Sequence, residues 1–170
     1  MESKTLKLRC ISAAAVLSLL ALGAAAQTQT PLQKRGAYLA RIMDCGGCHT
    51  PGALAGRPDD TKALAGSSIG FGIPSVGVFY PPNLTPDRET GLGKWTDAQV
   101  IAAIRTGTRP DGRMLAPIMP WRSYAALSNE DAKALAAYLK SLPPVRNAAP
   151  AMAGPSETPV APYLGLVVPK

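Results

Sequence analysis

Residues 45–49 read Cys45-Gly46-Gly47-Cys48-His49, and the rest of the chain has to be arranged around this stretch. On a helical turn, side chains at positions i and i+3 share one face and position i+4 falls beside them. Two thiols placed in this way can add to two vinyl groups on one edge of a porphyrin. The imidazole that follows them is then carried under the ring, within reach of its iron. This spacing is the attachment signature of a c-type haem, so the sequence predicts one covalent haem c held by Cys45, Cys48 and His49.

Other uses of the two cysteines fit the sequence less well. A thioredoxin-like redox motif follows a strand, whereas here a helical pattern precedes the motif. A structural zinc needs four ligands, and the whole chain has one His and three Cys. A plain disulfide would leave His49 without an explanation.

The second axial ligand of the iron must then be a Met, a Lys, a backbone group or water. Downstream of His49 the methionines are Met114, Met119 and Met152. Met119 lies between two prolines in the run 117–120, which stiffen its backbone. Met114 follows a flexible turn and is the main rival, and Met152 lies beyond the apparent end of the domain. A thioether ligand raises the reduction potential relative to harder donors.

Helical patterns flank the motif on both sides. Residues 32–43 have helical periodicity and lead directly into it, and Gly36 and Ala40 give that helix a small face where another helix can cross. A capping box at 96–99 opens a second helix through about residue 105, ended by Gly107. Ser128 caps a third helix, which Pro143 stops.

Long irregular loops, 51–95 and 108–127, separate these helices. Loops of this length are uncommon in a compact domain unless something besides protein fills its core. We therefore expect a mainly α fold, with three or more helices and long Gly/Pro-rich loops wrapped around one covalent haem. No sheet is expected, apart from a short strand within 76–80. The expected apolar shell of the haem consists of Phe71, Phe79, Leu84, Leu115, Ile118 and Trp121.

The two ends of the chain differ from its centre. Residues 1–26 combine a basic start, an apolar run and small residues, which predicts a cleaved export signal and a periplasmic location. An uncleaved membrane anchor is the alternative. Residues 27–142 are expected to form one haem domain. Residues 143–170 form a Pro/Ala-rich tail, interpreted as a strap over the domain or a partner rather than as a flexible extension.

The chain has 18 Lys+Arg, 11 Asp+Glu and a formal net charge of +7. The basic residues are scattered rather than clustered with stacking aromatics, which argues against nucleic acid as a partner. Arg105, Arg109, Arg113 and Arg122 surround the Met119 region, where they could neutralise haem propionates or attract an acidic redox partner.

Three stretches carry a family resemblance: RGAYLARIMDCGGCHTP (35–51), NLTPDRETGLGKWTDAQVIAAIRTGTRPDGR (83–113) and APIMPWRSYAALSNEDAKALAAYLKSLPPV (116–145). Over about residues 33–145 the chain resembles the class I cytochrome c domains of bacterial dehydrogenase complexes. These include subunits of alcohol and gluconate dehydrogenases and cytochromes paired with molybdenum hydroxylases. Alcohol and gluconate dehydrogenase subunits usually carry three haem motifs, whereas this chain has one.

The resemblance implies further features of the site. Met119 maps onto the distal iron ligand of the family. The first and last helices are expected to cross, with Gly36 and Ala40 against Leu135 and Tyr138. By analogy, His49 should donate its second ring N–H to a backbone carbonyl within residues 80–82.

Together these observations predict a single-haem electron-transfer protein rather than an enzyme. It would pass electrons from a periplasmic dehydrogenase, its donor, towards an oxidase or another cytochrome of the respiratory chain. The alternative is a haem enzyme or sensor with an open sixth coordination site, but no second His is present to act as its distal acid–base group. Membrane association, through an uncleaved signal or through a partner, is left open by the sequence.

Overall fold

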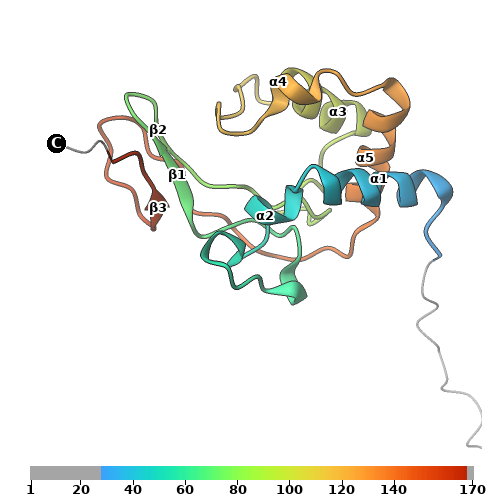
Figure 1. The fold of residues 1–170 in the computed structure, drawn as a ribbon, viewed down its shortest axis with the longest axis horizontal. Helices are drawn as coiled ribbons and strands as arrows, with labels where there is room; N and C mark the ends of the chain where they lie inside the picture. The colour runs from blue at the N-terminus through green and yellow to red at the C-terminus, as the bar shows by residue number, and fades with distance from the viewer. Residues whose placement is uncertain (1–27, 168–170) are drawn as a thin grey trace, which may run out of the picture.

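The computed structural model describes residues 28–167. In chain order its elements are α1 (Pro31–Ile42), α2 (Cys45–His49), two 3₁₀ turns (Ala53–Ala55 and Asp60–Lys62), β1 (Gly70–Ile73), β2 (Gly77–Phe79), α3 (Asp97–Thr106), α4 (Trp121–Tyr124), α5 (Asn129–Ser141) and β3 (Tyr163–Leu164). The helices gather at one end of the molecule and the small sheet lies at the other, with α2 between them (Figure 1). The predicted export signal lies outside the described residues. Within 28–167 no helix is long and apolar enough to cross a membrane.

The long helices begin at local caps that the sequence encodes. Thr30 and Gln33 exchange side-chain and backbone hydrogen bonds at the start of α1, and Thr96 and Gln99 do the same at the start of α3. Gly107 ends α3 with a φ of 73°, which a residue without Cβ adopts at little cost. The predicted boundaries of these two helices are therefore confirmed to within one residue.

Helices α1 and α5 cross at Gly36. A Cβ at this position would overlap the carbonyl group of Ala134 and lie 2.6 Å from the Cβ of Tyr138. The absence of a side chain thus allows the two backbones to approach closely, as the resemblance implies. Ser128 caps α5 by accepting a 3.0 Å hydrogen bond from the N–H of Asp131, and the Asp131 carboxylate accepts a 2.8 Å hydrogen bond from Arg35 of α1.

A three-stranded sheet with the order β2-β1-β3 corrects the expectation that the chain has none. Strand β2 lies within the predicted short strand 76–80, whereas β1 and β3 had no sequence signal. Phe71 of β1 is opposite Phe79 in antiparallel β2 and opposite Leu164 in parallel β3. Strand β1 was missed because two of its four residues are Gly and no alternation is visible.

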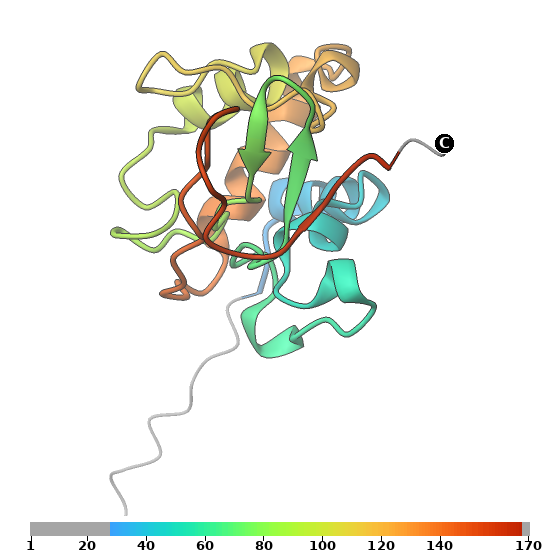
Figure 2. The ribbon, with the colours of Figure 1, turned by 90° about the vertical axis from the view of Figure 1, so that its left-hand side faces the viewer.

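The C-terminal segment lies along the hairpin of β1 and β2, and Figure 2 shows it in red curving past the green strands. Val78 and Ala153 exchange backbone hydrogen bonds of 2.8 and 3.0 Å. Gly77 faces this contact, and a Cβ there would overlap the carbonyl oxygen of Ala153. The Tyr80 hydroxyl donates to the carbonyl of Ala161 at 2.6 Å. Residues 143–167 are hereafter called the strap.

The root of the strap is held by Asn83, whose side chain is almost fully buried. Its Nδ2 donates to the carbonyl of Val145 at 2.7 Å and to Oγ1 of Thr90 at 3.0 Å. Its Oδ1 accepts from the backbone N–H of Thr85 at 2.9 Å. These contacts favour the strap interpretation over a flexible tail, while the division of the chain at residue 142 remains a prediction.

Candidate functional site

Helix α2 presents three chemically active side chains to one cavity. Asp44 has a φ of 52° and interrupts the helical path after α1, and its carboxylate accepts a 3.2 Å hydrogen bond from the N–H of Gly47. A separate helical turn therefore begins at Cys45. Cys45, Cys48 and His49 all line the same cavity.

The orientation of His49 is fixed by a backbone carbonyl. Its Nδ1 lies 2.8 Å from the carbonyl oxygen of Pro82, which can only accept, so Nδ1 carries the proton. The expected hydrogen bond to a carbonyl within 80–82 is thus confirmed. Burial lowers the pKa of His49, which favours the neutral ring. Its Nε2 then keeps a lone pair available for a metal.

The two cysteines are free thiols whose charged forms are disfavoured. Burial raises the pKa of Cys45 to about 11, and burial also raises the pKa of Cys48. Redox-active CxxC motifs show the opposite shift. Within residues 28–167 there is no group of three or more His, Cys, Asp or Glu side chains that could hold a metal ion.

The cavity measures about 740 Å³. This is within the range of roughly 300–1,000 Å³ typical of cofactor pockets. Its walls come from α2, α3 and α5, from the loops around 80–84 and 89–95, from the loop 109–120 and from residues 148–152. The predicted shell residues that line it are Phe71, Phe79, Leu84, Leu115 and Ile118.

Trp121, the sixth predicted shell residue, does not line this cavity. Its indole packs against Gly107, where a Cβ would stand 2.6 Å from the ring. Trp121 instead borders a smaller hollow of about 260 Å³ between the hairpin and the loop before α4. The prediction for Trp121 was wrong because Gly107 opens a site for the ring at the end of α3.

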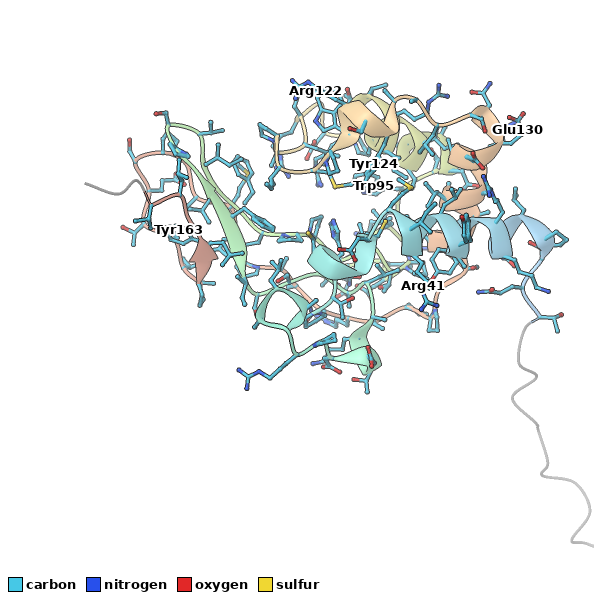
Figure 3. All side chains as sticks on the ribbon, viewed as in Figure 1. Arg41, Trp95, Arg122, Tyr124, Glu130 and Tyr163 are labelled. Atoms are coloured by element: carbon cyan, nitrogen blue, oxygen red, sulfur yellow. The ribbon has the colours of Figure 1, made fainter. Side chains whose placement is uncertain are left out.

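Trp95 and Tyr124 are aromatic wall residues that the sequence reasoning missed. Figure 3 shows both side chains between the α3–α4 layer and the α1–α2 layer. The Tyr124 hydroxyl donates to the carbonyl of Met43 at 3.1 Å. Trp95 directly precedes the capping residue Thr96, where a hydrophobic residue often packs inward, so its position was a readable signal.

The three candidate methionines differ in whether they line the cavity. Met119 lines it, as expected of a candidate ligand, whereas Met114 borders the smaller hollow and is 48% exposed. Met152 also lines the cavity, although the sequence placed it beyond the domain. The next residue, Ala153, pairs with Val78, and this pairing brings Met152 to the cavity. Its sulfur accepts a 3.2 Å hydrogen bond from Nη1 of Arg113.

The arginines near Met119 also separate into two groups. Arg109 and Arg113 line the cavity, and the Arg109 guanidinium lies 5.2 Å from the ring centroid of Trp95. Arg105 instead donates to Asn129 at 2.7 Å. Arg122 lies over Trp121 and points outward at the top of Figure 3. Positive charge at the cavity is therefore supplied by two of the four.

The residues present fit a covalently attached haem. Two protonated thiols and a neutral imidazole share one helical turn, and they face a largely apolar cavity of suitable size. Thioether sulfurs and two arginines complete its wall. The fold and the site therefore define a helical domain built around a porphyrin-sized cavity.

The cytochrome c family model matches residues 33–143, and the chain belongs to the cytochrome c family. The chain is 39% identical over 138 residues to the cytochrome c subunit of the quinone alcohol dehydrogenase of Gluconacetobacter polyoxogenes, covering 78% of this chain and 27% of the relative. It is 41% identical over 115 residues to the fructose dehydrogenase cytochrome subunit of Gluconobacter japonicus, covering 67% and 22%. It is 40% identical over 130 residues to the gluconate 2-dehydrogenase cytochrome c subunit of Pantoea cypripedii, covering 74% and 27%.

These matches confirm the resemblance to cytochromes of dehydrogenase complexes, and membership of the family implies a haem c. The chain spans about a quarter of the length of these curated relatives. Within residues 28–167 the structure combines five α-helices with a small sheet.

Proposed function

We propose that the chain is a single-haem c-type cytochrome that transfers electrons. Cys45 and Cys48 would form the two thioether links, and His49 and Met119 would be the axial iron ligands. The observation that carries the proposal is the orientation of His49: its Nδ1–H is held by Pro82, so its Nε2 is free beside the two cysteines on the cavity floor.

A haem bound here supplies a one-electron ferric/ferrous couple. His49 offers a fixed nitrogen donor, because its second ring nitrogen is already hydrogen-bonded. Met119 offers a soft neutral sulfur from a loop stiffened by two prolines. If His49 and Met119 both held the iron, a substrate would have no access to it, which would suit electron transfer. Arg109 and Arg113 offer positive charge to the carboxylates of the group.

Named relatives of the chain are cytochrome subunits of alcohol, fructose and gluconate dehydrogenases. We infer that this chain likewise accepts electrons from a dehydrogenase and passes them towards the respiratory chain. Export by residues 1–26 would place this transfer in the periplasm. Residues 27–142 would form the haem domain, with residues 143–170 as its C-terminal extension.

The visible spectrum of the purified ferric protein tests the axial ligands. We expect the weak far-red band of thioether–iron ligation. Met119→Ala should abolish the band and Met114→Ala should leave it intact, because Met114 lies outside the cavity. High-spin iron that readily binds small ligands would contradict the proposal and favour a haem enzyme or sensor.

A further inference from the structure

The loop that carries Met119 makes few hydrogen bonds to the rest of the molecule, although Arg109 of this loop also lies over the ring of Trp95. We call residues 108–119 the distal loop. Among the hydrogen bonds of the described residues, those of the distal loop connect to partners within residues 106–124, with one exception. The exception is the 3.2 Å bond from Nη1 of Arg113 to the sulfur of Met152.

The partner of that bond belongs to a firmly held part of the strap. Ala153 exchanges two backbone hydrogen bonds with Val78, and its side chain is only 4% exposed. Successive residues of an extended chain point to opposite faces. Met152 is therefore turned from the hairpin face that Ala153 occupies, and it lines the cavity.

The two cavity sulfurs differ in what they contact. The sulfur of Met152 accepts from a guanidinium, which has five N–H donors and no acceptor. One of the two lone pairs of this sulfur is thus engaged in the structure. No hydrogen bond involves the sulfur of Met119 within residues 28–167, and Met119 lines the same cavity. Met152 thus has a contact that can hold the loop, whereas the sulfur of Met119 makes no such contact.

We propose that Met152 is a positioning residue, which holds Arg113 and through it keeps the distal loop closed over the cavity. The inference rests on the proposed function, in which Met119 of this loop binds the iron. It extends the site into the strap, at a residue beyond position 143, where the match to the family model ends. The strap then controls how easily an external ligand displaces Met119.

Imidazole binding to the ferric full-length holoprotein tests the proposal, because imidazole must displace Met119. Met152→Leu keeps the apolar volume and removes the hydrogen-bond acceptor. Loss of one hydrogen bond of about 1 kcal/mol makes the loop easier to open, so we expect about fivefold tighter apparent imidazole binding. Val160→Ala is the matched control, since Val160 lies in the same strap and is 75% exposed. A double-mutant cycle with Arg113→Gln should show that the two effects do not add.

Hydrogen exchange of the distal loop provides a second readout that is independent of the axial ligand. We expect faster exchange of residues 108–119 in Met152→Leu than in Val160→Ala. Wild-type exchange and imidazole affinity in Met152→Leu would overturn the positioning role. Loss of the far-red band in Met152→Leu would overturn it as well, by making Met152 the ligand. A wild-type protein without this band would contradict the proposed function, while faster loop exchange would still support the contact.

Discussion

At Gly36 the backbones of α1 and α5 approach so closely that no side chain fits between them. Helix α1 leads into α2 and its cysteines, and α5 forms part of the cavity wall. The absence of a side chain at Gly36 therefore keeps α2, which carries the cysteines, close to α5, which forms part of the cavity wall. A methyl group at this position must push the helices apart, because the overlapping atoms of Ala134 belong to the backbone.

Gly36→Ala should lower the free energy of unfolding by about 1–3 kcal/mol, the usual cost of overpacking a tight contact. Chemical denaturation of the holoprotein, followed by circular dichroism, measures this change. Gly154→Ala is the matched control, because a Cβ there meets Glu157 atoms only at 3.6 Å or more. Equal denaturation midpoints for the two variants would contradict the prediction.

Residue-level predictions succeeded where local chemistry or family pattern determines the contact. The carbonyl partner of His49 and the small face at Gly36 were both expected, and both are observed. Met152 and Trp121 were misplaced for a physical reason. The position of Met152 depends on the bridge between the next residue, Ala153, and Val78, which lies 75 residues before Ala153, and that of Trp121 depends on the space beside Gly107. The roles of Cys45, Cys48 and Met119 remain predictions.

The pairing of α1 with α5 includes one ion pair, between Arg35 and Asp131. The hydrogen bond and the charge of Arg35 lower the pKa of Asp131 below its ordinary value of 3.8. In the unfolded chain the carboxyl regains its ordinary pKa and binds a proton at higher pH. The ion pair therefore stabilises the fold above about pH 4, and its contribution disappears as the pH falls through the folded-state pKa.

Arg35→Gln should reduce stability slightly at neutral pH, and the effect should shrink as the pH falls below the lowered pKa of Asp131, to what the contact of Arg35 with the Tyr38 ring contributes. The effect is small because the Arg35 side chain is half exposed, and added salt should reduce it further. Urea denaturation at a series of pH values measures it. Arg41→Gln is the control, because Arg41 lies on the same helix and has no ion-pair partner within 28–167. A pH-independent difference between wild type and Arg35→Gln would contradict the assignment.

Helices and strands were predictable from the sequence where the residues that determine them lie close together in the chain. The helices are predicted by capping residues, by their periodicity and, for α3, by Gly107, and each of these signals lies within or next to the helix that it predicts. The sheet has no such signal, because β1 is short and Gly-rich, and β3 has only two residues. Its pairing also joins residue 70 to residue 163, a connection that no local pattern encodes.

At the scale of the whole molecule, the strap links the loop after β2 to the cavity. Asn83 is the centre of this link, since both ends of its amide are used and its side chain is 1% exposed. This residue belongs to the sequence NLTPD that marks the family resemblance. Its contacts use both functions of an amide, because one end donates to Val145 and the other accepts from Thr85.

Asn83→Ala should lower the free energy of unfolding by about 2 kcal/mol, because it removes hydrogen bonds to the buried N–H of Thr85 and to the partly buried carbonyl of Val145. It should also accelerate hydrogen exchange throughout the strap. Arg146→Gln is a sharp control, because it removes the ion pair between Arg146 and Glu89, which links the same two segments at the surface.

Both members of that surface pair are largely exposed, so Arg146→Gln should change stability by less than about 1 kcal/mol. If the strap is held mainly by surface charge, the two variants would rank in the opposite order. If it is held by the buried amide, exchange in residues 145–167 will rise in Asn83→Ala alone. The outcome decides whether the strap is a fixed wall of the cavity. Salt weakens a surface ion pair much more than a buried hydrogen bond, so only the buried amide can hold the strap in place at any ionic strength.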